Sequence, residues 1–119
     1  MPRDVLLVKI QNALADGQSL YEATRQSWKI SQTGLSDIKY VVGISGGRVV
    51  SAYEPTTWHL IDNEEAEVPE DVGRNRFDGD EAPSEVMLKF QRAKRLLLSK
   101  FGQGAAIAYA SLEEIDSYG

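Results

Sequence analysis

The stretch Tyr40-Val-Val-Gly-Ile-Ser-Gly-Gly-Arg-Val-Val-Ser-Ala-Tyr53 decides the fold class of this chain. Its two halves are rich in β-branched and aromatic residues, which is typical of β-strands. Gly46-Gly47 lies between the halves, and glycine tolerates the positive φ angles of a tight hairpin turn. Glu54-Pro55 is expected to end or bulge the second strand, because proline cannot donate a ladder hydrogen bond. The stretch therefore predicts an antiparallel hairpin.

Shorter runs predict more strands beyond this hairpin, at 56–61, 74–77 and 105–109. An acidic loop, about 62–73, joins the first two of these runs and is expected to be exposed and mobile. Together with the hairpin, the runs predict an antiparallel sheet of about four to five strands.

Two helices are predicted before the hairpin. The first lies within 3–16 and ends at Gly17, because apolar residues there have helical spacing: Val5, Leu6, Ile10, Ala13 and Leu14. Ser19 and Glu22 have the spacing of a capping box, in which each side chain satisfies a free amide at a helix start. A short second helix is therefore predicted over 20–26.

A long amphipathic helix is predicted to begin at Pro83-Ser84-Glu85 and to end at Gly102-Gln103-Gly104. Its apolar residues recur every three or four positions and form one stripe: Val86, Phe90, Ala93, Leu97 and Phe101. The whole order predicts an α+β fold, in which an antiparallel sheet packs with an N-terminal helix and a C-terminal amphipathic helix. The length of 119 residues fits a single domain over 1–119.

Composition removes several classes of function. The sequence has no cysteine, which excludes disulfides, zinc-thiolate sites and a cysteine nucleophile, and it has one histidine, His59. No signal peptide or membrane span is expected from its short apolar runs, and a cytoplasmic location is expected. The net charge of −5 makes tight binding to duplex DNA a poor hypothesis, because phosphate neutralisation needs a basic surface.

Charge is spread unevenly along the chain. Ten acidic residues lie between Asp62 and Glu85, against two basic ones, Arg74 and Arg76. The segment 89–100 then carries five basic residues and no acidic one: Lys89, Arg92, Lys94, Arg95 and Lys100. Each run is read either as a solvated face or as part of a local anion site.

Aromatic and arginine residues are the main candidates for a binding site. Tyr21 and Arg25 lie four residues apart and share a helix face, with Trp28 close behind them. Arginine offers donors that suit phosphate or carboxylate, and aromatic rings offer a stacking surface. The alternative is that Trp28 belongs to the core and that Arg25 pairs with an acidic residue.

A second candidate group lies in the strand predicted at 74–77. Alternation places Arg74 and Arg76 on one face, and Asn75 and Phe77 on the other. The arginines suit a pyrophosphate and Phe77 a stacked base, or the arginines simply neutralise their acidic neighbours. Arg95, on the polar face of the last predicted helix, is a further candidate phosphate contact.

No catalytic residue or metal site is assigned. No nucleophile elbow is assigned, because the one Gly-x-Ser-x-Gly stretch, Gly43 to Gly47, lies in the predicted hairpin turn between two strands, and His59 has no obvious acidic partner in the sequence. The acidic loop lacks the spacing of a calcium-binding loop. Arginine and aromatic residues without a catalytic base therefore indicate a non-enzymatic binder of a negatively charged, base-containing small ligand, with no cofactor.

Several short motifs carry a resemblance to a known family. They are Tyr21-Glu-Ala-Thr-Arg25-x-x-Trp28-Lys29-Ile30, Tyr40-Val-Val-Gly-Ile44, Gly47-Arg-Val-Val50, Tyr53-Glu-Pro-Thr-x-Trp58 and Arg76-Phe77-x-Gly79-x-x-Ala82-Pro83. Over 21–83, and more loosely to 109, the chain resembles the first-described phage anti-Thoeris proteins, which act as signal sponges. The tail departs from the family's Gly-x-x-Asn-Pro-Ile-x-Tyr pattern, because alanines occupy much of 104–108.

The resemblance implies a function without chemistry. Such proteins bind cyclic ADP-ribose isomers made by the TIR enzymes of Thoeris defence, in the cytoplasm of the infected bacterial host, and some also bind cyclic oligonucleotides. It implies a homodimer or hexamer with ligand at the subunit interface. Arg25 as phosphate donor and Phe77 as stacking ring are the positions carried over from the family. The altered tail predicts a changed ligand preference or weaker affinity.

Two other functions remain open at this point. The first is a small β-rich nucleic-acid-binding module of the PUA-like kind, whose groove would use the basic segment 89–100. The second is a protein–protein inhibitor that acts through the acidic loop 62–73.

Overall fold

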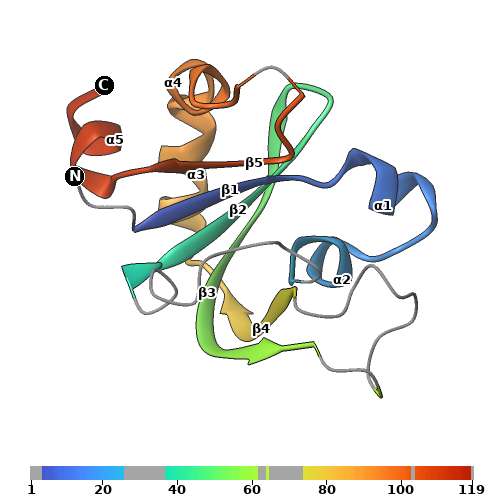
Figure 1. Cartoon of the computed structure of the whole chain (residues 1–119). Coiled ribbons are helices and arrows are strands. Elements are labelled where there is room, and N and C mark those ends of the chain that lie inside the picture. The colour runs from blue at the N-terminus through green and yellow to red at the C-terminus, as the bar shows by residue number, and fades with distance from the viewer. Residues whose placement is uncertain (1–3, 26–36, 62–63, 65–73, 103, 119) are drawn as a thin grey trace.

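A mixed five-stranded sheet organises the chain, in a computed structural model that describes residues 4–25, 37–61, 64, 74–102 and 104–118. The strands are β1 (Val5–Lys9), β2 (Tyr40–Ser45), β3 (Arg48–Leu60), β4 (Asn75–Glu81) and β5 (Ile107–Ala110). The helices are α1 (Gln11–Ala15), α2 (Leu20–Arg25), α3 (Ser84–Arg92), α4 (Lys94–Ser99) and α5 (Leu112–Tyr118). The strand order is β4-β3-β2-β1-β5 (Figure 1). The predicted α+β class is confirmed.

The helix predicted over 3–16 is wrong in its first half. Residues Val5–Lys9 form β1, which pairs in parallel with β2 and antiparallel with β5, so the sheet is not purely antiparallel. Four consecutive apolar residues, Val5 to Val8, are fully buried because both faces of this inner strand are covered. A continuous apolar run also satisfies the helical period, and here burial on both faces favours the strand. Only Gln11–Ala15 is helical.

The hairpin predicted at 40–53 is confirmed. Strands β2 and β3 pair antiparallel, and Gly46 and Gly47 adopt φ angles of 58° and 76° in the turn between them. Strand β3 continues past Pro55, where its register with β4 shifts between Pro55 and Thr57. The predicted strand at 56–61 is therefore the far half of β3, and Pro55 marks a bulge rather than an end.

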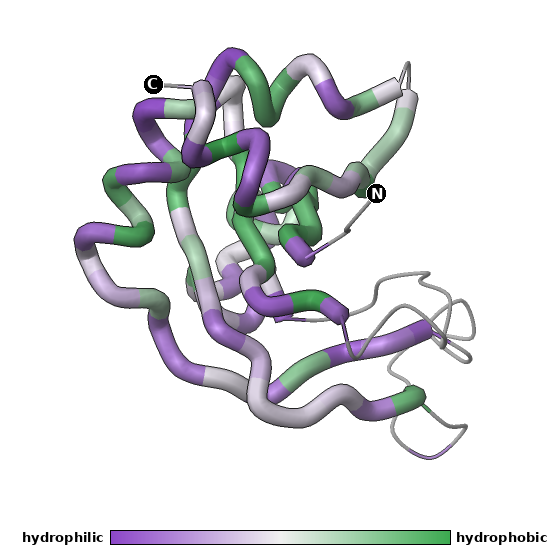
Figure 2. Tube along the Cα trace, turned by 90° about the vertical axis from the view of Figure 1, so that its left-hand side faces the viewer, coloured by the Kyte–Doolittle hydropathy of each residue, from purple (hydrophilic) through white to green (hydrophobic). Residues whose placement is uncertain are grey.

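The sheet has helices on both faces, so the fold has three layers. In β1, Val5 and Leu7 face one core cluster, which α3, α4 and α5 cover through residues such as Phe90, Leu97 and Ile115. Leu6 and Val8 face the other cluster, which α1 and α2 cover. Figures 1 and 2 show the helices around the sheet and the hydrophobic inner strands. Helix α2 therefore packs against the face of the sheet that carries Leu6 and Val8.

The C-terminal part contains two short helices where one long helix is predicted. The backbone departs from helical geometry at Ala93, between α3 and α4, where φ is −91° and ψ is 15°. The apolar stripe is still used, because Phe90, Ala93 and Leu97 are all buried. Strand β5 confirms the predicted last strand, and α5 after it is an element that the predictions lack. No helix among the described residues is long and apolar enough to cross a membrane.

Candidate functional site

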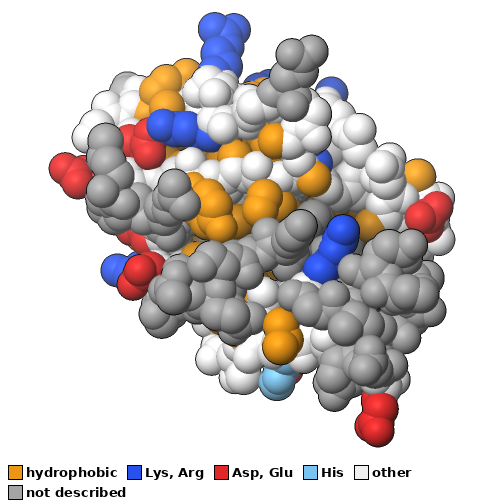
Figure 3. Space-filling view, in the orientation of Figure 1, with side chains coloured by type: hydrophobic (Ala, Val, Ile, Leu, Met, Phe, Trp, Pro, Cys, Tyr) orange, Lys and Arg blue, Asp and Glu red, His pale blue; other side chains and the backbone are white. Residues whose placement is uncertain are grey.

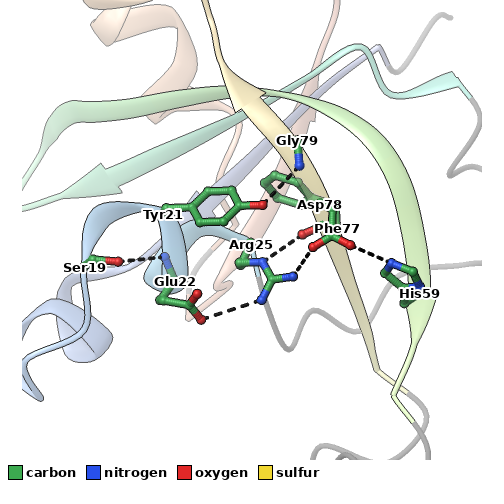
Figure 4. A network of polar contacts seen from close by, with 8 residues as sticks. All are labelled: Ser19, Tyr21, Glu22, Arg25, His59, Phe77, Asp78 and Gly79. Carbon is green, nitrogen blue, oxygen red and sulfur yellow. Dashed lines mark hydrogen bonds and ion pairs between the residues drawn. The ribbon is translucent and has the colours of Figure 1, made fainter.

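Helix α2 places two side chains against the outer edge of β4. The Tyr21 hydroxyl accepts a hydrogen bond of 3.1 Å from the backbone N–H of Gly79. The Arg25 Nε donates to the backbone carbonyl of Phe77 at 3.0 Å (Figure 4). An edge strand presents unpaired backbone groups that attract other chains, and here side chains satisfy two of them. Tyr21 and Arg25 therefore cap the edge of the sheet.

The Arg25 guanidinium also contacts two carboxylates. Its terminal nitrogens pair with Asp78 Oδ1 and, at 3.7 Å, with Glu22 Oε2. The ring of Tyr21 lies beneath it, with 5.2 Å between the guanidinium carbon and the ring centroid, which is a cation–π distance. Burial alone lowers the pKa of Arg25, but the hydrogen bond to Asp78 and the nearby carboxylates outweigh burial, so the pKa is raised overall. Arg25 is thus a fully charged donor held from several sides.

Asp78 bridges Arg25 to the only histidine of the chain. The second carboxylate oxygen of Asp78 lies 2.8 Å from His59 Nε2 on the neighbouring strand. The pKa of Asp78 is lowered, first by the hydrogen bond to His59; burial acts in the opposite direction, and Arg25 lowers the pKa further. The expectation that His59 lacks an acidic partner is therefore wrong. We call the arrangement of Arg25, Asp78 and His59 the carboxylate clamp.

The clamp is accessible to solvent on one side. The Asp78 side chain is 50% exposed and that of His59 is 42% exposed, whereas Arg25 is only 14% exposed. His59 is visible at the surface in Figure 3 as the pale blue side chain. Arg25 is therefore anchored in the protein, whereas His59 and the Asp78 carboxylate face water.

Local packing fixes α2 in this position. Ser19 Oγ accepts a hydrogen bond from the Glu22 amide at 3.2 Å, as the predicted cap requires. Further along α2, the hydroxyls of Thr24 and Ser51 are 2.7 Å apart in a buried contact. Gly43 lies below them, and a Cβ there would overlap with Ser51 Oγ. The absence of a side chain at Gly43 lets α2 approach the sheet closely.

Phe77 and Asn75 are core residues. Both are buried, which confirms the predicted alternation of β4, since Arg74 and Arg76 on either side are partly exposed. The Phe77 ring is fully buried and contacts Tyr21, Tyr53 and Trp58, with 5.3 Å between its centroid and that of Trp58. The Phe77 ring therefore does not offer a free face for the predicted stacking on a base.

The other predicted residues are not gathered at the clamp. Arg74 is partly buried, and its carbonyl accepts a hydrogen bond from Ile61 at the start of β4. Arg95 is exposed on α4, which packs on the opposite face of the sheet from α2. Trp28 and most of the acidic loop 62–73 lie outside the described residues. Of the seven predicted residues, Tyr21, Arg25 and Phe77 meet in the structure.

Part of the basic segment 89–100 is neutralised by α5. Lys89 Nζ lies 2.7 Å from Asp116, and Lys100 pairs with Glu114. The Asp116 hydrogen bond raises the pKa of Lys89, and the Lys100 hydrogen bond lowers that of Glu114. The groove that a PUA-like function needs therefore loses two of its five charges to intramolecular pairs.

The prediction lacks the His59–Asp78 pair because the two residues are 19 apart in sequence and meet only through strand register. The only local signal for this pair is that Trp58 directly precedes the single histidine, His59, and this signal is weak. Among the described residues, no group of three or more His, Asp or Glu side chains is placed to hold a metal ion.

Comparisons with protein-family models, with curated proteins and with solved structures give no match to this chain. A function for the clamp is therefore argued from its geometry and from the motifs in the sequence.

Proposed function

We propose that this protein is a non-enzymatic binder that sequesters a small phosphorylated nucleotide of the cyclic ADP-ribose class. The observation that carries the proposal is the carboxylate clamp. Two donors from separate elements, Arg25 on α2 and His59 on β3, converge on the two oxygens of the half-exposed Asp78. A phosphate group offers the same acceptors, and charge-assisted hydrogen bonds to such oxygens are among the strong ones.

The clamp suits binding better than catalysis. Arg25 is held by Tyr21, Glu22, Phe77 and Asp78, so that it is oriented before any ligand arrives. Preorganised donors gain affinity because little ordering entropy is lost on binding. Asp78 fills the anion position in the free protein, and a bound phosphate replaces its carboxylate between the two donors.

The resemblance to anti-Thoeris sponges supplies the ligand class and the biological setting. In this proposal the chain lowers free signal nucleotide in an infected bacterium and so blocks Thoeris immunity. A sponge needs no turnover, but its dissociation constant must lie well below that of the effector it competes with. A homodimer or hexamer, with ligand at the subunit interface, and a second class of cyclic-oligonucleotide ligand belong to the same proposal.

The test is a thermal-shift and calorimetric titration of the whole protein with cyclic ADP-ribose isomers. Free ligand at 100 times the dissociation constant is expected to add about 2.7 kcal/mol of stability. We expect His59→Ala to weaken binding, because one of the two donors is lost. Asp78→Asn is expected to strengthen it, because the competing charge is removed while the shape of the side chain is kept.

Arg95→Ala is the matched control. It removes a cationic side chain from an exposed site on the opposite face of the sheet, so it is expected to leave affinity unchanged. No stabilisation by any isomer would refute the proposed ligand. Equal affinities of wild type, His59→Ala and Asp78→Asn would show that binding, if present, does not use the clamp.

A further inference from the structure

A second binding feature lies along the near half of β3, away from the clamp. Strand β4 pairs with β3 only from Tyr53 to Leu60, so within the described residues Arg48–Ser51 has one strand neighbour, β2. An open groove of about 820 Å³ lies at the end of this segment, where Val50 and Ser51 of β3 line it. Its volume is in the range of ligand sites in proteins, about 300–1,000 Å³.

The groove has an apolar interior between two helices. Leu20 of α2 and Met87 and Leu88 of α3 line it together with Val50 of β3. Leu20 and Leu88 are 42% and 45% exposed, which is unusual for large apolar side chains. Exposed apolar side chains gathered at a hollow are typical of interaction sites.

The bottom of the groove is an open strand edge. The β2–β3 register passes from the Gly43–Ser51 pair to the Ile44–Val49 pair, so Val50 is a bulged residue without a partner in β2. At the end of the open segment, the Ala52 carbonyl accepts a hydrogen bond of 2.9 Å from the Ala82 amide. The Ala52 carbonyl thus points to the open side of β3, and an extended chain placed there can continue the hydrogen-bond ladder that Ala82 begins.

The charges around the groove select a basic partner. Glu81 and Glu85 are exposed in its lining, and no lysine or arginine among the described residues lines it. Burial and the nearby Glu81 raise the pKa of the Tyr53 hydroxyl at the same wall. A phosphorylated ligand is disfavoured beside two carboxylates, whereas lysine or arginine side chains are attracted there.

We propose that this groove binds an extended peptide segment of another protein, with both apolar and basic side chains, as an added strand beside Arg48–Ser51. Main-chain hydrogen bonds to an open edge give affinity in such complexes, and alternate side chains enter pockets on either side. Successive side chains of the added strand point to opposite faces of the sheet, so apolar ones contact Leu20 on the α2 side and Leu88 on the α3 side, and basic ones reach Glu81 and Glu85. The inference is independent of the nucleotide-binding proposal.

The experiment uses a library of random linear peptides displayed on phage and selected against the whole protein. Enriched peptides are expected to contain both apolar residues and lysine or arginine. A synthetic copy of the best one is then titrated by calorimetry. Its affinity should fall about tenfold, or 1.4 kcal/mol, in Leu88→Ser and in the double variant Glu81→Gln/Glu85→Gln. Leu60→Ser, which alters an exposed leucine outside the groove lining, is the control and should leave affinity unchanged.

Nuclear magnetic resonance of the complex decides the binding mode. An added strand gives cross-strand contacts between the peptide and Arg48–Ser51, and a helical bound peptide would overturn the proposal. Enriched peptides without basic residues, or equal affinity for the Leu88→Ser variant, would also overturn it. Self-association of the chain that Leu88→Ser abolishes would assign the groove to a second copy and refute a foreign peptide. Nucleotide titrations of these variants are expected to match wild type, which separates the two proposals.

Discussion

Replacing Gly43 with alanine tests how α2 is held against the sheet. A Cβ at this position would overlap with Ser51 Oγ and would lie 2.8 Å from Ile10 Cδ1 and 2.9 Å from Thr24 Oγ1. Real Cβ contacts are longer than these, so side chains or α2 itself must move. Overpacking of a core costs about 1–3 kcal/mol. Loss of the Thr24–Ser51 hydrogen bond adds about 1 kcal/mol, which gives a total of about 2–4 kcal/mol.

The assay is chemical and thermal unfolding of wild type and variant. For a chain of this length, each kcal/mol lowers Tm by about 4 °C, so Gly43→Ala is expected to lower Tm by about 8–16 °C. The control is Gly102→Ala, because a Cβ on Gly102 would meet no heavy atom within 4 Å and the residue has no positive φ. It should leave Tm nearly unchanged.

A second substitution shows whether the steric explanation is right. Ser51→Ala removes the nearest atom, so in the Gly43→Ala background it should restore part of the lost stability, with a coupling energy of about 1 kcal/mol. Recovery is partial because Ile10 and Thr24 are still close. A Gly43→Ala protein as stable as wild type, or no recovery with Ser51→Ala, would refute the proposed contact between α2 and the sheet.

Three further predictions concern the clamp, a helix cap and the core. The folded-state pKa of Asp78 is lowered, so its stabilising effect is present above the unfolded pKa of about 3.9 and is lost as pH falls through the lower folded value. The free energy of unfolding in urea should therefore change less with pH in Asp78→Asn than in wild type below about pH 4. Ser111→Ala should cost about 1 kcal/mol in urea unfolding, because the Ser111 hydroxyl accepts a hydrogen bond from the Glu114 amide at the start of α5, while the Glu114 carboxylate accepts one from the Ser111 amide. Phe77→Ala should cost about 3–5 kcal/mol by the same measurement if Phe77 is a core residue, and a loss below 1 kcal/mol would instead favour an exposed ring.

Local signals in the sequence predict the hairpin and α2 well. Gly46-Gly47 forms the turn between two segments rich in β-forming residues. Ser19 caps α2 by accepting a hydrogen bond from the Glu22 amide. These features depend on residues close together in the chain, so sequence pattern alone contains the needed information. Helix α5 also has a local signal, because Ser111 and Glu114 have the spacing of a capping box.

Strand β1 shows where local pattern is insufficient. The run Val5 to Val8 fits a helix face and a doubly buried strand equally well. Its strand neighbours, Tyr40–Ser45 and Ile107–Ala110, are 30 or more positions away in the sequence. Only the formation of the whole sheet decides between the two, because it is the sheet that buries both faces of the run.

The clamp depends on strand register, which the sequence signals only in part. The predicted irregularity at Pro55 is present as a shift of register before Thr57. That shift sets Thr57 opposite Asp78 and leaves His59 within hydrogen-bond distance of the same carboxylate. The aromatic and arginine pattern therefore predicts that Arg25 matters, but its partner Asp78 is 53 residues away in the sequence, and His59 is a further 19 residues from Asp78.

Tyr21 connects the two proposed binding features physically. Its ring lies 5.1 Å from that of Tyr53, which lines the groove, and it supports the Arg25 guanidinium of the clamp from below. A peptide that displaced Tyr53 would therefore also move the ring on which Arg25 rests. Any such effect must be reciprocal, because a change in nucleotide affinity caused by peptide equals the change in peptide affinity caused by nucleotide. Tyr21 thus both caps the edge of the sheet and contacts one residue of each proposed site.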